Sequence, residues 1–454
     1  MDFENKKVLV VGMARSGLAA AEVLHKRGAE VTACDQKTDE QVGSVKNELE
    51  AIGITTHYQS YPEVSSQHFD ILILSPGVPL DIRPVKEAFK QGIPVIGELE
   101  LAYLLKAEPV QMYAVTGTNG KTTTTSLLQC MLAEDGRNSI SGGNIGVPLT
   151  KLVDNMAEGT ISVEVSSFQL ETIIDFKPHI CGMLNITPDH LDRHKTIELY
   201  ANIKSRIFAN QTDNDYAVLN YEDNRIRSMA SRCRPRVVFF STDRVLKEGA
   251  FIQNKQIIVA IDDQKTEICK VDEVLLRGKH NLENILCAAA MAFVAGVKPD
   301  IIRKSLLSFP GVRHRMEETA LIEGCLYIND SKATNPDSVI KALQAFDQPV
   351  ILIAGGRNKG FDFSVLAQEI HKRVKALIIL GEAKQEIKTA VIERGFKNIY
   401  EVEDLAAAVN KTQELAAKGD VVLLSPACAS WDMFPSYEHR GDEFCQLVYS
   451  LNNS

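Results

Sequence analysis

A threonine- and glycine-rich segment at residues 116–125 separates a short apolar run from a leucine-bearing stretch. The apolar run covers residues 112–115, and the leucine-bearing stretch covers residues 126–132. This order predicts a strand, a glycine loop and a helix, in which backbone N–H groups at the helix N-terminus surround phosphate oxygens. We therefore expect the chain to bind ATP or a related nucleotide at this loop.

The side chains of this loop have separate expected roles. Lys121 is long enough to reach the terminal phosphates, and Thr122 or Thr123 offers a hydroxyl group to Mg²⁺. The strict phosphate-loop pattern has glycine at position 115, where this chain has Val115. The alternative is a strand, loop and helix with ordinary glycine turns and a solvated lysine, which the flanking apolar segments disfavour.

Size, charge and cysteine usage narrow the class of protein. A length of 454 residues predicts about three domains. The net charge of −9 argues against a nucleic-acid partner, because such a partner needs a basic face. The nine cysteines include no CxxC pair, so neither a disulfide framework nor a cysteine zinc cluster is indicated. The sequence lacks a signal-peptide core and an apolar run of about 18 residues, so we expect a cytoplasmic protein without membrane insertion.

The first part of the chain predicts a Rossmann-like start. Expected strands and a helix alternate at residues 7–11, 18–27, 30–34 and 71–74. The glycine fingerprint of a dinucleotide site is incomplete, because its central position holds Ala14, whose methyl group obstructs a pyrophosphate. An NAD site is therefore less favoured than a site for another kind of nucleotide.

The second part of the chain carries polar side chains after its expected strands. Glu164 ends an alternating apolar run, as the acidic residue of a nucleotide site often does, and is a candidate Mg²⁺ ligand. An ordinary exposed strand carboxylate is the alternative. Thr187 is expected to be an N-cap and Pro188 the first helical residue, which places His190 in the first turn of a helix.

Lys204 is the most unusual side chain of this part. It falls within the apolar stripe of an expected helix that also contains Ile197 and Phe208. A desolvated lysine has a lowered pKa, and its free amine can capture CO₂ to form a carbamate that ligates metal. The alternative is a lysine that extends from the edge of the stripe to solvent.

The third part of the chain predicts another small, mostly parallel sheet. Expected strands at residues 350–353, 376–380 and 421–424 alternate with helical stretches. Four polar loops occur in this part, at residues 313–315, 329–336, 355–360 and 425–432. Because ligands bind at the carboxyl ends of strands in open α/β sheets, we expect the four loops to converge on one cleft.

Nine segments of the chain together resemble the Mur ligase family. They are GTNGKT, EVSSFQLE, NITPDHLDRH, the helix around Lys204, GKHNLEN, HRME, NDSKATNP, GGRNKG and SPACASWD, and in this order they span essentially all of the sequence. NDSKATNP and SPACASWD resemble the D-glutamate-adding branch. The arginine signature of the diaminopimelate-adding branch, DNPR, is absent from the sequence.

The resemblance implies an α/β protein of three domains. Residues 1–100 would form a Rossmann-like domain that binds a UDP-sugar, residues 101–310 a central ATPase-type domain, and residues 311–454 a Rossmann-like domain for the amino acid. The implied activity is that of an ATP-dependent ligase of peptidoglycan precursor synthesis. It would add D-glutamate to UDP-N-acetylmuramoyl-L-alanine through an acyl phosphate, as a monomer.

The resemblance also assigns site residues by position. Nucleotide contacts are implied for Gly117, Thr118, Asn119, Gly120, Lys121, Thr122, Thr123, Asn281, Arg315 and Asp330. Two Mg²⁺ ions, replaceable by Mn²⁺, would be served by Thr122, Glu164, His190 and a carbamate on Lys204. Catalytic roles are implied for Lys121, Asn144, Glu164, His190, Lys204 and Lys332. Substrate contacts are implied for Gly12, Arg15, Ser16, Asp35 and Ser75 with the UDP-sugar, and for Thr334, Lys359, Ser430, Trp431 and Tyr437 with D-glutamate.

Two other classes of protein stay open at this point. A folate polyglutamylating ligase would use the same ATP chemistry with another acceptor, and a uridine-binding first domain would exclude it. A nucleotide sensor without enzymatic activity would bind ATP, and amino-acid-dependent turnover of ATP would exclude that class.

Overall fold

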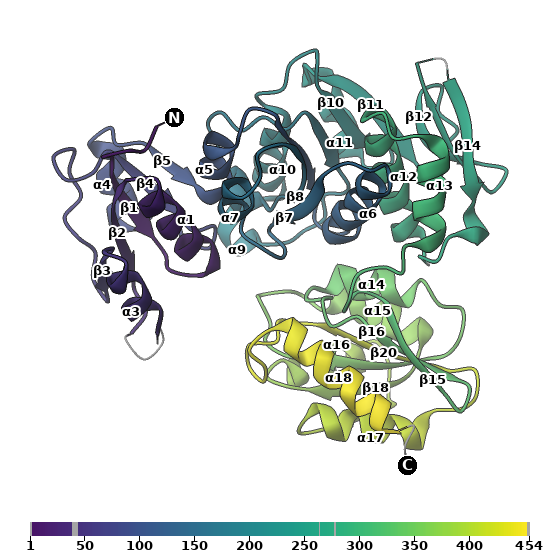
Figure 1. Ribbon diagram of the computed structural model, residues 1–454. Helices are drawn as coiled ribbons and strands as arrows, with labels where there is room; N and C mark the ends of the chain where they lie inside the picture. Colours follow the sequence, from purple (N-terminus) through teal and green to yellow (C-terminus); the bar gives the residue numbers. More distant parts are fainter. Residues whose placement is uncertain (1, 39–43, 263, 277, 452–454) are drawn as a thin grey trace. The chain divides into compact units, whose positions relative to one another are not determined.

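The computed structural model describes residues 2–38, 44–262, 264–276 and 278–451. Its strands form three β-sheets, each accompanied by helices (Figure 1). The chain divides into two compact units. The first unit comprises Met1–Ile186, Glu198–Ile268 and Leu286–Ser305, and the second comprises Thr187–Ile197, Cys269–Ile285 and Leu306–Ser454. The predicted domain boundaries near residues 100 and 310 stay a prediction.

The first sheet contains five parallel strands in the order β3-β2-β1-β4-β5. Its elements follow the chain as β1 (Lys7–Val11), α1 (Arg15–Lys26), β2 (Glu30–Asp35), α3 (Ser44–Ala51), β3 (Thr55–Tyr58), β4 (Ile71–Leu74), α4 (Arg83–Lys90), β5 (Val95–Gly97) and α5 (Glu98–Leu105). The expected Rossmann-like fold is confirmed. Helix α1 begins at Arg15 rather than Leu18, because Ala14 already adopts the extended conformation of an N-cap.

The second sheet contains nine strands in the order β14-β13-β12-β11-β10-β9-β6-β8-β7. It begins with β6 (Val110–Thr116), α6 (Lys121–Glu134), β7 (Ser139–Gly143), α7 (Leu149–Asp154), β8 (Gly159–Glu164), α8 (Ser167–Leu170) and β9 (Ile180–Met183). It continues with α9 (Leu191–His194), α10 (Ile197–Ser205), β10 (Tyr216–Asn220), α11 (Asn224–Met229), β11 (Arg236–Ser241), β12 (Gly249–Gln253), β13 (Gln256–Ile261), β14 (Gln264–Lys270), α12 (Lys279–Val294) and α13 (Pro299–Ser308). The strands from β7 to β12 are parallel, and β13 pairs with β12 antiparallel.

The third sheet contains six strands in the order β15-β16-β20-β17-β18-β19, of which only the pairing of β15 with β16 is antiparallel. Its elements are β15 (Glu317–Ile322), β16 (Cys325–Asn329), α14 (Pro336–Leu343), β17 (Val350–Gly355), α15 (Ser364–Arg373), β18 (Val374–Leu380), α16 (Lys384–Glu393), β19 (Ile399–Glu401), α17 (Leu405–Leu415), β20 (Val421–Ala427) and α18 (Tyr437–Leu451).

Helices cover both faces of this third sheet, and each face has its own apolar core. Along β17, Leu352 packs with α14, α15 and α16, whereas its neighbours Ile351 and Ile353 pack with α17 and α18. Successive side chains of a strand point to opposite faces. A strand that is covered on both faces therefore needs an unbroken apolar run, and residues 350–354 provide one.

Two buried carboxylates anchor α5 to the second sheet's domain. Glu100 accepts the three successive backbone N–H groups of residues 174–176 at 2.8–2.9 Å. Glu98 accepts the N–H and the hydroxyl group of Thr150 at 2.7 and 3.0 Å, and burial raises the pKa of Glu98 to about 7. Both side chains are almost fully buried, so these hydrogen bonds replace lost hydration.

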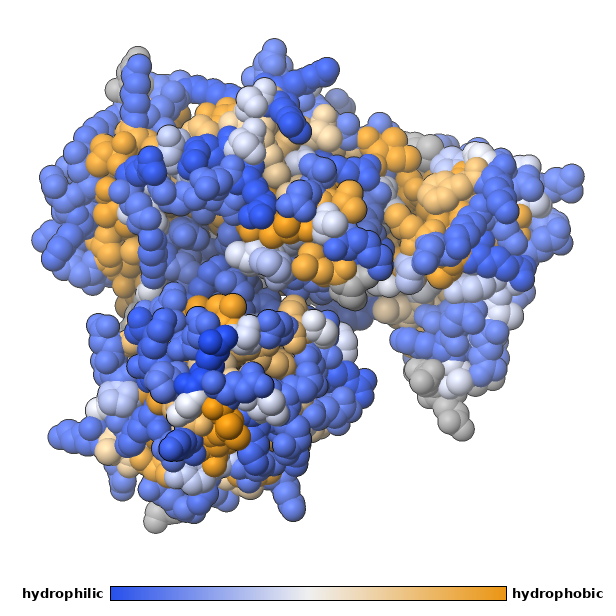
Figure 2. Space-filling model, turned by 180° about the vertical axis from the view of Figure 1, so that it is seen from behind, coloured by the Kyte–Doolittle hydropathy of each residue, from blue (hydrophilic) through white to orange (hydrophobic). Residues whose placement is uncertain are grey.

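Hydrophilic residues predominate on the face that Figure 2 shows, and apolar side chains form separate groups on it. No helix within the described residues is long and apolar enough to cross a membrane.

The anchoring role of Glu100 is testable. The glutamine of Glu100→Gln has a single amide oxygen, which can accept two of the three N–H groups. Its NH₂ group would face the third N–H, and two donors cannot hydrogen-bond to each other. An unsatisfied buried donor costs about 1–3 kcal/mol, so the free energy of unfolding should fall by that amount in urea denaturation. Glu22→Gln is the control, because Glu22 is half-buried and only pairs with Lys151. An equal effect of the two substitutions would contradict the anchoring role.

Candidate active site

The glycine loop connects the carboxyl end of β6 to the N-terminus of α6, as predicted. Gly117 and Gly120 have φ values of 150° and 86°, a region that disfavours other residues, and Gly120 is the N-cap of α6. A Cβ atom on Gly117 would also lie 3.0 Å from the Cβ atom of Leu184. The backbone therefore needs glycine here, and the first N–H groups of α6, at Lys121, Thr122 and Thr123, face the loop.

Two lysine ammonium groups donate to the same carbonyl oxygen of this loop. Lys121 Nζ lies 3.0 Å from Gly117 O and 2.7 Å from Thr118 O, and Lys204 Nζ lies 2.8 Å from Gly117 O. Lys204 is only 1% exposed, and its Nζ lies 4.6 Å from the ring centroid of Tyr200. The alternative that Lys204 reaches solvent is wrong. Two positive charges at one loop attract an anion such as a phosphate group.

Glu164, Thr122 and Asn144 meet beside the loop. The Glu164 carboxylate accepts the Thr122 hydroxyl at 2.7 Å and the Asn144 side-chain amide at 2.9 Å. Parallel pairing of β7 with β8 aligns Gly143 with Glu164, which brings Asn144 next to the carboxylate. Because Mg²⁺ prefers oxygen ligands, the carboxylate and the hydroxyl group fit the expected metal.

An asparagine pair that we did not predict holds the loop in place. Asn119 N–H donates to the Asn185 side-chain oxygen at 2.9 Å, and the Asn185 side-chain amide donates to Asn119 O at 3.1 Å. Thr118 N–H donates to Asn185 O at 2.8 Å. The sequence signals for Asn185 were its place two residues after a buried strand and at the start of the NITPDHLDRH segment.

His190 is placed differently from our expectation. The predicted N-cap at Thr187 is wrong, because α9 begins at Leu191 with His190 itself as its N-cap. His190 has a left-handed φ of 52°, and its N–H donates to the Asp189 carboxylate at 3.0 Å. His190 belongs to the second unit and Lys204 to the first, so their shared metal role stays a prediction. Within the described residues, no group of three His, Cys, Asp or Glu side chains could hold a metal.

The predicted UDP-sugar residues gather at the carboxyl ends of β1, β2 and β4. The Asp35 carboxylate accepts the N–H of residue 13 at 2.6 Å, and the Ser75 hydroxyl donates to Gly12 O at 2.6 Å. A Cβ atom on Gly17 would lie 1.8 Å from Gly12 O, so α1 packs against this loop only with glycine there. Arg15 and Ser16 open α1, and the Arg15 guanidinium donates to the carbonyl of Gly146.

A cavity of about 490 Å³ in the second unit contains two of the predicted nucleotide contacts. Asn281 and Arg315 line it together with apolar side chains such as Ile328 and Phe346. Burial lowers the pKa of the neighbouring His280 to about 3, so this imidazole is neutral. The lining combines apolar side chains with Asn281 and the charged Arg313, Arg315, Glu317 and Glu318, so it offers both an apolar surface for a planar base and polar partners for its edge.

Asp330 is buried behind Arg315. Its carboxylate lies 3.5 Å from the Arg315 guanidinium and accepts the Ser425 hydroxyl at 2.8 Å. Burial raises the pKa of Asp330 to about 6, although Arg315 and these hydrogen bonds oppose the rise. Ser425 was not predicted as a partner.

Backbone hydrogen bonds join the four polar loops of the second unit. Lys332 N–H donates to His314 O at 3.0 Å, Ala427 N–H to Ala333 O at 2.9 Å, and Arg357 N–H to Ala429 O at 2.9 Å. The four loops are therefore neighbours, whereas their convergence on one cleft stays a prediction.

The residues expected to contact D-glutamate differ in their surroundings within these loops. Lys332 Nζ lies 5.3 Å from the ring centroid of Tyr437, and the half-buried Lys359 lies at the same distance from Phe361. Ser430 is buried, whereas the neighbouring Trp431 is 65% exposed. Thr334 N–H donates to Lys332 O at 3.0 Å.

The fold and the glycine loop define a multidomain α/β protein with a strand, loop and helix of the phosphate-binding type. The chain matches three family descriptions: Mur ligase MurD-like, N-terminal domain, at residues 6–97; Mur ligase middle domain at residues 115–292; and Mur ligase, glutamate ligase domain, at residues 314–428. It belongs to the Mur ligase family.

Curated relatives share its full length. A protein of Pelotomaculum thermopropionicum named UDP-N-acetylmuramoylalanine--D-glutamate ligase is 46% identical over 99% of both chains. A protein of the same name from Clostridioides difficile is 41% identical over 99% of this chain and all of that one.

Solved structures share the fold at low sequence identity. The UDP-N-acetylmuramate-alanine ligase of Thermotoga maritima superimposes with a TM-score of 0.61, at 18% identity, over 98% of this chain and all of that one. The MurF ligase of Thermotoga maritima, solved with ADP, has a TM-score of 0.60 at 18% identity, over all of this chain and 97% of that one.

The raised pKa of Asp330 predicts a pH-dependent stability difference. Between about pH 4 and about pH 6 the unfolded chain has lost the Asp330 proton while the folded protein still holds it. Below about pH 4 the group therefore has no effect on stability, and above about pH 6 its ionisation lowers the free energy of unfolding by about 3 kcal/mol. Relative to the parent, Asp330→Asn should therefore gain stability as the pH rises from 4.5 to 8. Thermal unfolding across this range measures the difference. Asp347→Asn, at an exposed position of the same sheet's domain, is the control variant. A flat difference for Asp330→Asn would contradict the shift.

Proposed function

We propose that this protein is the ATP-dependent ligase that joins D-glutamate to UDP-N-acetylmuramoyl-L-alanine, with release of ADP and phosphate, in the synthesis of peptidoglycan precursors. The observation that carries the proposal is the pair of lysines on the glycine loop beside the Glu164–Thr122 pair. The names of full-length relatives at 41–46% identity supply the substrates.

The predicted nucleotide contacts lie on the glycine loop of the first unit and in the cavity of the second unit. Loop N–H groups and Lys121 would hold the phosphates, since they present donors and positive charge. Asn281 and Arg315 line this cavity and would contact the base and the ribose, and Asp330, which pairs with the Arg315 guanidinium, would complete the set of nucleotide contacts.

Mg²⁺ would be held by Thr122 and Glu164 at one position, and by His190 with a carbamate on Lys204 at a second. When bound, it neutralises charge on the transferring phosphoryl group. The protein's oxygens at the first position already face each other, and Asn144 holds the carboxylate in that orientation. A carbamate would form when the Lys204 ammonium loses a proton, the resulting amine attacks CO₂, and the adduct loses a second proton. The charge of the side chain would then change from +1 to −1.

The reaction needs no nucleophile from the protein. The carboxylate of the alanyl residue attacks the γ-phosphorus atom in line, which forms an acyl phosphate and expels ADP. The amine of D-glutamate then attacks the carbonyl carbon, loses a proton and expels phosphate. Lys121 and Asn144 stabilise the charge that moves during phosphoryl transfer, and the loops position the two substrates.

Each substrate would have its own set of contacts. The uridine end would lie on the loops after β1, β2 and β4, where Gly12, Arg15, Ser16, Asp35 and Ser75 gather. D-Glutamate carries two carboxylates and would be surrounded by Lys332, Thr334, Lys359, Ser430, Trp431 and Tyr437. The protein would act as a monomer in the cytoplasm.

A phosphate-release assay with crossed substrates tests this function. UDP-N-acetylmuramoyl-L-alanine, other UDP-muramoyl acceptors and a folate are each combined with D-Glu, L-Glu, L-Ala, meso-diaminopimelate or L-Lys. Only the first acceptor with D-Glu should release phosphate, and Lys121→Ala should nearly abolish the release while it leaves the fold intact. Turnover with the folate would favour the polyglutamylating class. ATP binding without amino-acid-dependent turnover would favour the sensor.

The carbamate on Lys204 predicts chemical rescue. Lys204→Ala should be inactive, and acetate or formate should restore part of its activity, because a small carboxylate can occupy the place of the carbamate. Lys121→Ala is the matched control, since Lys121 donates to the same carbonyl oxygen but is not expected to carry a carbamate. Full activity of Lys204→Ala, or equal rescue of both variants, would contradict the carbamate.

A further inference from the structure

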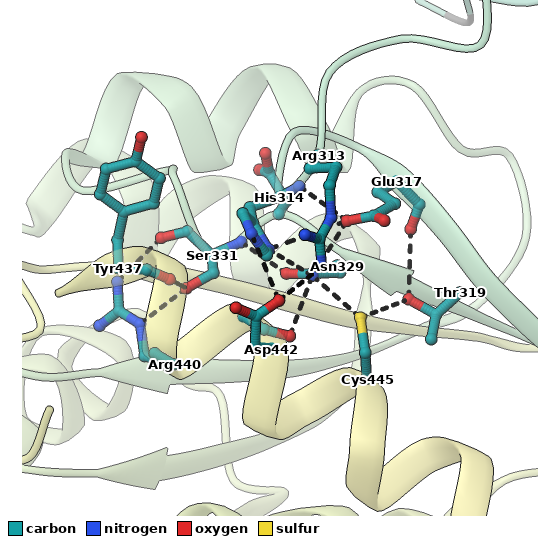
Figure 3. A network of polar contacts seen from close by, with 12 residues as sticks. Arg313, His314, Glu317, Thr319, Asn329, Ser331, Tyr437, Arg440, Asp442 and Cys445 are labelled. Atoms are coloured by element: carbon teal, nitrogen blue, oxygen red, sulfur yellow. Dashed lines mark hydrogen bonds and ion pairs between the residues drawn. The ribbon is translucent and has the colours of Figure 1, made fainter. Parts of the chain in front are cut away.

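His314 is a buried imidazole that the proposed chemistry does not use. It is 4% exposed, has a left-handed φ of 62° and lies against the N-terminal part of α18 (Figure 3). A Cβ atom on Gly441 would lie 2.2 Å from His314 Nδ1, so α18 needs glycine at this position to admit the ring. The ring centroid of Tyr437 lies 6.3 Å away.

The neighbouring Asn329 shows which ring nitrogen carries the proton. Its side-chain nitrogen faces Gly441 O and Glu317 Oε2, both at 3.2 Å, and Cys445 Sγ at 3.3 Å (Figure 3). Its side-chain oxygen accepts the Ser331 N–H at 3.2 Å. A carbonyl oxygen and a carboxylate only accept, whereas a backbone N–H only donates. The orientation of the Asn329 amide is therefore determined by its partners.

The same side-chain nitrogen of Asn329 lies 3.0 Å from His314 Nδ1. The amide nitrogen offers only donor hydrogens, so it disfavours a proton on Nδ1 and favours the neutral ring with its proton on Nε2. Two carboxylates flank the ring at similar distances: Glu317 Oε2 lies 3.8 Å from Nδ1, and Asp442 Oδ1 lies 3.7 Å from Nε2. The contacts of Asn329 therefore favour the neutral Nε2–H form of the ring.

Two predicted contact residues depend on the position of His314. Its carbonyl oxygen accepts the N–H of Lys332 at 3.0 Å, and the next residue, Arg315, forms the ion pair with Asp330. Its own N–H donates to the Glu317 carboxylate at 2.7 Å. We propose that His314, held neutral between Asn329 and Gly441, is a positioning residue that fixes Arg315 for ATP and Lys332 for D-glutamate. This role rests on the proposed function.

Protonation would break the arrangement. The charged groups that face the ring are Glu317 on β15, Asp442 and Glu438 on α18, and Arg313 on the preceding loop. Burial lowers the pKa of His314 below its ordinary value of 6.5 and outweighs the opposing carboxylates. An imidazolium would place an Nδ1–H beside the Asn329 amide nitrogen, a second donor, and would draw the ring toward Glu317 Oε2, which lies 3.8 Å from Nδ1. We therefore expect the ring to shift in acid.

Two substitutions distinguish the effect of losing the Nδ1 hydrogen-bond acceptor from the effect of losing the volume of the ring. His314→Leu removes the acceptor, whereas His314→Asn keeps an acceptor near the Nδ1 position and tolerates a left-handed φ. We expect His314→Leu to raise the KM values for ATP and D-Glu by about 10- to 100-fold, the scale of a displacement of about 1 Å. The KM for the UDP-sugar should change less than about threefold, and His314→Asn should restore most of the loss. His371→Leu, an exposed histidine on α15, is the matched control.

The pH profile is the readout that a purely structural role would not move. As the pH falls, the KM for ATP should rise more steeply in the parent than in His314→Asn. Asp330 titrates in both proteins, so the difference between the two pH profiles reports the titration of His314. Equal profiles, or equal KM values for His314→Leu and His314→Asn, would overturn the proposal.

A second measurement does not depend on ligase activity or on a folded leucine variant. ¹⁵N NMR of the histidine-labelled parent, assigned by the signal lost in His314→Asn, should show an unprotonated Nδ1 and a protonated Nε2 at neutral pH. A protonated Nδ1 would overturn the proposal even if the ligase activity is confirmed. If the NMR shows the expected tautomer but the protein has no ligase activity, the result would count against the proposed function alone.

Discussion

The carbonyl oxygen of Gly117 accepts hydrogen bonds from the ammonium groups of Lys121 and Lys204. One lysine comes from the first turn of α6 and the other from the last turn of α10, so a single backbone atom ties both helices to the loop after β6. Lys204 is buried, so its ammonium group depends on acceptors such as this carbonyl oxygen. The donors gathered at the loop suit an anionic ligand such as a triphosphate.

Several parts of this arrangement could be predicted from the sequence because their signals are local. The glycine loop follows from the order of strand, glycines and helix, and Glu164 follows from its place at a strand end. The strands of the third sheet follow from unbroken apolar runs such as residues 350–354. Their bounds were shorter in prediction than in the structure, since β17 and β20 continue into glycine, proline and alanine residues.

Other parts depend on contacts between residues far apart in the chain, which local patterns do not show. The pairing of Asn119 with Asn185 needs β6 and β9 to be neighbours, and the Asn329 network needs α18 to lie beside β16. The expected helix start at Thr187 was wrong for a local reason instead. A threonine followed by a proline favoured it, but the left-handed His190, whose N–H donates to the adjacent Asp189 carboxylate, is the N-cap, and the helix begins at Leu191.

The central claim is that a substrate carboxylate, rather than water, receives the phosphoryl group that this loop holds. Isotope transfer measures this directly. UDP-N-acetylmuramoyl-L-alanine labelled with ¹⁸O in its alanyl carboxylate is turned over with ATP and D-Glu, and the released phosphate is analysed by mass spectrometry. The acyl phosphate route predicts one ¹⁸O atom in each phosphate, because the bridging oxygen leaves with phosphorus. Unlabelled phosphate would contradict the account.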